Sequence, residues 1–121
     1  MTKPTHQDAT LMVQLAQWGS SMGLEDAYNW IFSDEFVTDY AAFQEKYPMG
    51  SEGYGTAFKI CYWAETVGTL YKQGLFSGEL LFDWLAAAMM WERLKGFALG
   101  MREQYGIPGL WENFEAMAKA Q

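Results

Sequence analysis

Apolar side chains recur at helical spacing along most of the chain, beginning in the N-terminal segment. The first apolar stripe consists of Leu11, Leu15, Trp18 and Met22. These positions are i, i+4, i+7 and i+11, which lie on one face of an α-helix. Asp8 is expected to be the N-cap of this helix, and residues 1–7 before it are expected to be flexible.

Two shorter stripes occupy the segment between residues 24 and 48. The first consists of Leu24, Tyr28 and Ile31, and the second of Phe36, Tyr40, Phe43 and Tyr47. This spacing predicts two helices with a break near Ser33, which two acidic residues follow as in a new N-terminal turn. Pro48 is expected to end the second helix. Residues 49–55 contain three glycines, so they are expected to form a loop.

A longer helix is predicted from Tyr54 to Gln73. Its apolar face consists of Ala57, Ile60, Cys61, Ala64, Val67, Gly68 and Tyr71. A glycine inside a helix costs about 1 kcal/mol relative to alanine, so Gly68 is expected to allow close approach of another helix or an aromatic ring. Gly74 is then expected to end this helix, and Ser77 to cap the next one.

The segment after Ser77 carries two apolar stripes that are out of phase. The first consists of Leu81, Trp84, Leu85 and Ala88, and the second of Trp91, Leu94, Ala98, Met101 and Tyr105. At the helical period the stripes differ by roughly a quarter turn, which predicts a short helix, a bend near residues 85–87 and a long helix to about Tyr105. Gly106 is expected to end the long helix, and Pro108 to open a last one.

No segment alternates between apolar and polar residues as a half-buried strand would. The pattern therefore predicts an all-α protein. Residues 1–121 are expected to form a single compact bundle of about six helices, with a bent long helix in the C-terminal half. Half of the 121 residues are hydrophobic, which suffices to bury one core without disulfides or metal ions.

The charge distribution excludes two classes of partner. The net charge is −7, from 15 acidic and 8 basic residues, and the bases are scattered along the chain. Nucleic acids and anionic membrane surfaces need clustered Lys and Arg, so neither is expected as a partner. A membrane-spanning helix needs about 20 apolar residues, whereas the longest charge-free apolar run extends only from Trp84 to Trp91.

Few residues are suited to metal binding or nucleophilic catalysis. His6 is the only histidine, and Cys61 is the only cysteine and falls in the middle of a predicted helix. A reactive thiolate needs a nearby cation or a helix N-terminus, so Cys61 is expected to be a core residue. Neither a metal nor a cofactor is predicted. The absence of a possible internal disulfide fits the cytoplasm.

Carboxylates next to aromatic residues are the remaining candidates for chemistry. Glu65 lies at the edge of an apolar helix face, Asp83 lies between Phe82 and Trp84, and Glu92 follows Trp91. A carboxyl group in an aromatic pocket can have a raised pKa and act as a general acid. The alternative is a structural role, for example an ion pair of Glu65 or Glu92 with Arg93 or Arg102.

The region from Tyr62 to Ala118 resembles the DUF4760 family of helical proteins. The matching segments are "WAETVGTLYKQGLFSGELLFDWL", "WERLKGFALGMRE" and "LWENFEAM". The resemblance implies an all-α fold without an assigned activity, and it implies a version without the membrane helix that many relatives carry upstream. The positions that it singles out are Glu65, Gly68, Trp84, Trp91, Arg102 and Phe114.

Two functional hypotheses remain open at this point. The first is a non-enzymatic helical interaction module in the cytoplasm, which binds a protein partner or a second copy of itself. The eight Met and six Trp residues would serve such a surface. The alternative is a small-ligand sensor or hydrolytic enzyme with an aromatic pocket between the helices Tyr54–Gln73 and Trp91–Tyr105. Its ligand-binding residues would be Glu65, Trp91, Glu92 and Arg102.

Overall fold

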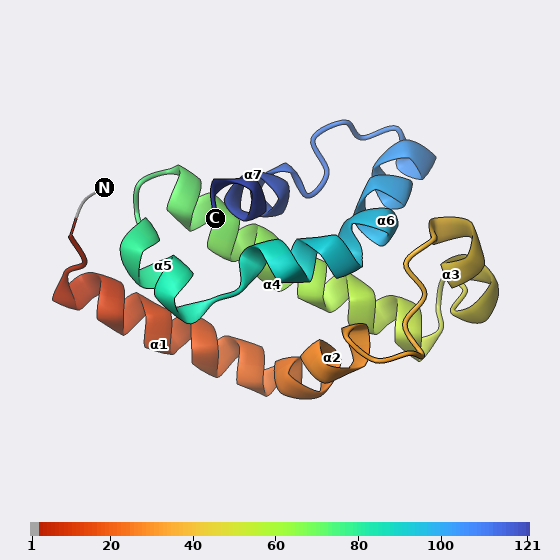
Figure 1. Ribbon diagram of the computed structural model, residues 1–121, viewed down its shortest axis with the longest axis horizontal. Helices are drawn as coiled ribbons and strands as arrows, with labels where there is room; N and C mark the ends of the chain where they lie inside the picture. Colours follow the sequence, from red (N-terminus) through yellow and green to blue (C-terminus); the bar gives the residue numbers. More distant parts are fainter. Residues whose placement is uncertain (1–2) are drawn as a thin grey trace.

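The computed structural model describes residues 3–121, and these residues form helices joined by short loops (Figure 1). The helices are α1 (His6–Ser21), α2 (Leu24–Ile31), α3 (Tyr40–Lys46), α4 (Glu52–Lys72), α5 (Gly78–Trp84), α6 (Ala87–Tyr105) and α7 (Glu112–Ala120). No strand occurs among the described residues, so the all-α prediction is confirmed. The seven helices are close to the six expected.

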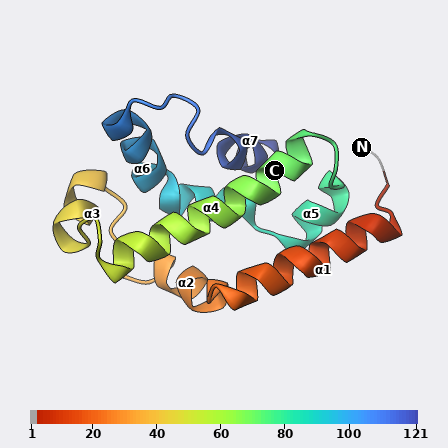
Figure 2. The same cartoon turned by 180° about the vertical axis from the view of Figure 1, so that it is seen from behind.

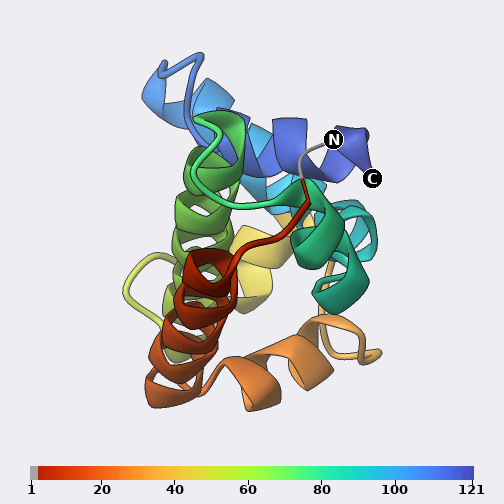
Figure 3. The same ribbon diagram turned by 90° about the vertical axis from the view of Figure 1, so that its left-hand side faces the viewer.

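Helix α4 is the central element and crosses the whole molecule from the α3 end to the α5 end (Figure 2). Helix α7 lies above α4 and α2 lies below it in Figure 2, and the view in Figure 3 likewise has α7 at the top and α2 at the bottom. Ile60, Trp63 and Val67 of α4 are completely buried. The Trp63 indole Nε1 donates to the Leu15 carbonyl at 3.0 Å, which satisfies its only polar atom and fixes α1 against α4.

The C-terminal half bends where the two apolar stripes predict it. Helix α5 ends at Trp84, and Leu85 has an extended backbone with φ −114° and ψ 127°. Helix α6 then runs to Tyr105, where Gly106 takes the left-handed conformation at φ 63°. The bend lets each helix turn its own apolar stripe inward, because a straight helix would expose one of them.

The first helix begins earlier than the sequence predicts. Thr5, and not Asp8, is the N-cap, so His6 and Gln7 already belong to α1; residues 1–2 lie outside the described range. Asp8 forms a capping box with Thr5 and also accepts the Ser77 backbone N–H at 2.9 Å. Hydrogen bonds from the backbone of Thr5 and Ser77 hold the pKa of Asp8 below its usual value. One carboxylate therefore serves two chain segments.

Three other helix starts also differ from the prediction. Helix α3 is capped by Asp39 instead of Ser33, and α4 begins at Glu52, inside the predicted loop. Helix α7 begins at Glu112, so Pro108 lies in the preceding turn and does not open the helix. In α4 the Ser51 side chain caps the first turn, and this outweighs the glycines that indicated a loop.

Replacing Gly68 with alanine is expected to destabilise the protein. A Cβ at this position would overlap the Asn113 carbonyl at the start of α7, which confirms the predicted close approach. The overlap is expected to lower the free energy of unfolding by about 1–3 kcal/mol in urea denaturation. Gly55→Ala in the same helix is the control, because its Cβ would meet nothing within 4 Å. Gly55→Ala should raise the free energy of unfolding by about 0.5–1 kcal/mol. The same change in both variants would contradict a close contact between Gly68 and α7.

Candidate functional site

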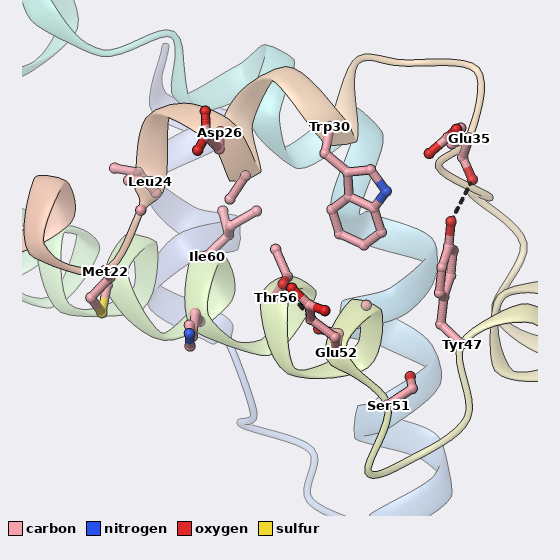
Figure 4. Close-up of a pocket in the computed structure, with 14 residues that line it drawn as sticks. Met22, Leu24, Asp26, Trp30, Glu35, Tyr47, Ser51, Glu52, Thr56 and Ile60 are labelled. Carbon is pink, nitrogen blue, oxygen red and sulfur yellow. Dashed lines mark hydrogen bonds between the residues drawn. The ribbon is translucent and has the colours of Figure 1, made fainter.

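An open groove lies between α2 and the N-terminal half of α4 (Figure 4). Its volume is about 570 Å³, which falls within the range of binding sites for small molecules and side chains. The lining residues are Met22, Gly23, Leu24, Asp26, Ala27, Trp30, Glu35, Tyr47, Ser51, Glu52, Gly53, Thr56, Lys59 and Ile60. The groove thus combines apolar side chains with several carboxylates.

Local sequence features place α2 beside α4. Gly23 takes the left-handed conformation at φ 74°, which allows the chain to turn sharply between α1 and α2. Ala27 and Ile31 are the buried residues of α2. At its C-terminal end the Arg93 side chain donates to the carbonyls of Ile31 and Ser33. These bonds satisfy carbonyls that have no partner inside the helix, and the cation complements the helix dipole.

Trp30 forms the aromatic wall of the groove and is held by other rings. Its ring lies edge-on to Phe36 at 5.1 Å and to Tyr47 at 5.4 Å, measured between centroids. The Tyr47 hydroxyl donates to the Glu35 carbonyl at 3.3 Å, and Lys46 Nζ donates to the same carbonyl at 2.9 Å. These contacts fix the loop that carries Glu35, so this end of the groove is preorganised.

The groove is acidic. Asp26, Glu35 and Glu52 contribute carboxylates, and Lys59 contributes the single cation. Within residues 3–121, none of these three carboxylates is part of an ion pair. Asp26 and Glu52 lie in the first turns of α2 and α4, where the helix dipole favours a negative charge. The apolar floor is therefore bordered by charges without protein counter-ions.

Glu65, the first residue predicted for the site, holds the N-terminus of α7. Its carboxylate accepts the backbone N–H of Asn113 at 3.0 Å, that of Phe114 at 2.9 Å and the Asn113 side-chain amide at 2.8 Å. The N-cap of α7 is Trp111, whose side chain offers no capping hydrogen bond. Glu65 of α4 therefore supplies the cap from another helix.

The other predicted residues have packing or surface positions. Trp91 is buried and lies edge-on to Phe114 at 5.1 Å. Glu92 is exposed and pairs with Lys95 at 3.0 Å. Glu65 borders one hollow, and Trp91 and Glu92 border another, so the structure does not bring the predicted set into one cavity.

Arg102 ties the end of α6 to α7. Its Nε donates to the Leu110 carbonyl at 2.9 Å, and its Nη1 contacts Glu115 at 3.1 Å. Burial raises the pKa of Glu115, but hydrogen bonds and charges from Lys119 and Arg102 outweigh this effect and leave that pKa below its usual value. Arg102 and Glu115 thus fix the turn before α7.

The structure also places Cys61 and the groups that could bind metal. Cys61 is completely buried, as predicted for a core residue. Burial, and next the charge of Glu65, raises the pKa of its thiol, which is therefore protonated at neutral pH. Within the described part of the chain, no group of three or more His, Cys, Asp or Glu residues is arranged to hold a metal ion.

A family comparison covers nearly the whole chain. The model of the domain of unknown function DUF4760 matches residues 4–121. The chain belongs to the DUF4760 family. The match includes residues 4–61, which the sequence resemblance did not reach, so α1, α2 and the groove lie inside the DUF4760 unit. No curated protein and no solved structure matches the chain. In the described range of this DUF4760 chain, no helix has both the length and the apolar character to cross a membrane.

Sequence reasoning missed Trp30, Glu35 and Glu52. Trp30 lies off the stripe of Leu24, Tyr28 and Ile31, and a large ring outside the buried face of a helix is the signal that could have found it. The acids gave no signal, because acids near helix starts are usual. The meeting of these three residues depends on tertiary contacts between α2, α4 and the loop before α3.

Replacing Glu65 with alanine is expected to destabilise the protein by about 2–3 kcal/mol. Three hydrogen bonds to a carboxylate are lost, and the first N–H groups of α7 lose their cap. Chemical denaturation measures the loss, and hydrogen exchange at Asn113 and Phe114 localises it. Glu92→Ala is the control and should change stability by less than about 0.5 kcal/mol, since its ion pair is exposed. Similar losses in the two variants would contradict this role of Glu65.

Proposed function

We propose that this protein is a non-enzymatic interaction module that binds a segment of a partner protein in the groove between α2 and α4. The observation that carries the proposal is an open groove with an apolar floor and a Trp wall (Figure 4). Grooves between helices are a recurrent site for such segments, and tryptophan is enriched among residues that dominate binding energy. The rings around Trp30 keep the wall in place without a partner.

The geometry gives less support to a hydrolytic enzyme or a sensor that uses Glu65 or Glu92. The Glu65 carboxylate is engaged by three N–H groups, and Glu92 is exposed beside Lys95. A general acid needs a carboxyl group that faces a substrate. The groove also lies on the α2 side of α4 and not between α4 and α6, where the sequence hypothesis placed the pocket.

We also propose a cytoplasmic location for this module. The chain has one cysteine, and that residue is buried in the core with a protonated thiol. The protein therefore owes its stability to packing and hydrogen bonds and needs no oxidising compartment.

Blocking the groove is expected to abolish partner binding. Thr56 lines the groove, so Thr56→Trp would fill much of it. Thr10→Trp on α1 is a matched control, because both hydroxyls donate to the carbonyl four residues earlier. In quantitative affinity purification from lysate of the source organism, the wild type and Thr10→Trp should recover a common partner that Thr56→Trp loses at least tenfold.

Thermal unfolding shows first that both variants are folded. A partner retained by Thr56→Trp would contradict the groove as the binding site. Failure of the wild type and Thr10→Trp to recover any protein above a bait-free control would contradict the interaction module itself.

Self-association is a second candidate, favoured by an exposed aromatic pair on α4. Phe58 is 39% exposed and Tyr62 51%, and their rings stack with centroids 6.4 Å apart. Ile107, also half exposed, borders the same hollow. Exposed apolar surface of this kind often marks an interface between copies.

Light scattering over a range of concentrations tests a homodimer through this aromatic pair. A dimeric mass that falls to the monomer in Tyr62→Glu, but not in Met89→Glu on α6, is the expected result. Met89 is 58% exposed, so its substitution controls for the added charge. A monomeric mass for the wild type at high concentration removes this candidate.

A further inference from the structure

The groove between α2 and α4 has two chemically different ends (Figure 4). Met22 and Leu24 give the first end an aliphatic lining, and Asp26 lies there too. Trp30, Glu35 and Glu52 lie toward the second end, where the lining is aromatic and acidic. A segment that follows the groove therefore meets aliphatic side chains at one end and an aromatic ring with two carboxylates at the other.

The length of the groove corresponds to about two helical turns. Leu24 and Trp30 are six residues apart in α2, which corresponds to about 9 Å along the helix axis. Side chains at i, i+4 and i+7 of a bound helix span a similar distance on one face. A helix of the partner would thus present aliphatic residues in one turn and a different chemistry in the next.

The charges of the second end select a cation. Glu35 and Glu52 form no ion pair within residues 3–121, and the groove as a whole is lined by three carboxylates and the single cation of Lys59. The face of a tryptophan ring attracts Lys and Arg side chains. The net charge of −7 repels acidic partners and speeds the approach of basic ones.

We infer that the groove binds a basic amphipathic helix of a partner protein. Aliphatic side chains of that helix pack against the partly exposed Met22 and Leu24, and a Lys or Arg one or two turns away lies against Trp30 between Glu35 and Glu52. This inference rests on the proposed function and specifies the chemistry of its partner. The unpaired carboxylates then gain counter-ions on binding, while the apolar floor is removed from water.

Synthetic helical peptides test the charge requirement. The probe is a fluorescein-labelled peptide of Ala, with Leu at i and i+4 and Lys at i+7, i+8 and i+11, compared with the same peptide carrying Gln or Glu at the Lys positions. Fluorescence anisotropy at low and high salt measures binding up to about 1 mM peptide. The Lys peptide should bind at least fivefold more tightly than the Gln peptide, and its affinity should fall at high salt. The Glu peptide should bind more weakly than the Gln peptide.

A pair of double variants localises the effect to the groove. Glu35→Gln with Glu52→Gln should weaken binding of the Lys peptide about fivefold, as expected for two partly exposed charge contacts. Glu79→Gln with Glu103→Gln is the matched control. The control double variant changes the net charge by the same amount. Glu79 lies in the first turn of α5, as Glu52 does in α4, and both control residues are exposed. This control should change affinity less than twofold.

Each outcome decides the inference. Equal binding of the Lys and Gln peptides would overturn it, and so would equal weakening by the two double variants, because the attraction would then come from the whole protein. Binding of no peptide would also overturn it. The proposed function is judged separately by the loss of the natural partner in Thr56→Trp, so the charge inference can fail while groove binding stands.

Discussion

The contact between Glu65 and the first turn of α7 is the interaction on which the C-terminal half of the fold depends. Helix α7 starts after Trp111, a residue with positive φ and no capping side-chain bond, so its first N–H groups need partners from elsewhere. Glu65 supplies them. Gly68, one turn further along α4, leaves room for the Asn113 backbone to approach. The two residues act together, because the carboxylate can reach α7 only if the helices are this close.

The two sides of α4 differ in how closely they are packed. On the α7 side, Phe114 and Met117 are completely buried, and Trp91 packs against Phe114. On the α2 side, Ala27 and Ile31 reach the core while Trp30 stays at its edge. Helix α4 is thus tightly packed against α7 on one side and borders an open groove on its α2 side. The contacts of Glu65 and Gly68 with the start of α7 give both residues a structural role.

Particular elements show what the sequence could predict. The bend between α5 and α6 was predictable, because two stripes out of phase cannot face one core on a straight helix. The start of α7 was not, because its cap lies 48 residues earlier in the chain, and only the tertiary fold brings Glu65 to Asn113. The groove was not predictable for the same reason, since only the tertiary fold brings its residues together. Trp30, Glu35 and Glu52 belong to three separate segments, and their meeting depends on the Arg93 bonds that hold the end of α2.

The acidic composition has a different meaning once the residues are placed in space. Glu92 and Glu115 are paired with nearby bases, and the pair of Glu115 with Arg102 holds the turn before α7. Glu35 and Glu52 lack such partners in the described chain and line the groove together with the partly exposed Trp30. Both carboxylates are exposed, so water solvates them in the unbound protein and folding does not depend on a counter-ion for them. For the proposed basic helix these carboxylates supply complementary charge, so on that proposal the charge pattern of the groove contributes to specificity rather than to folding.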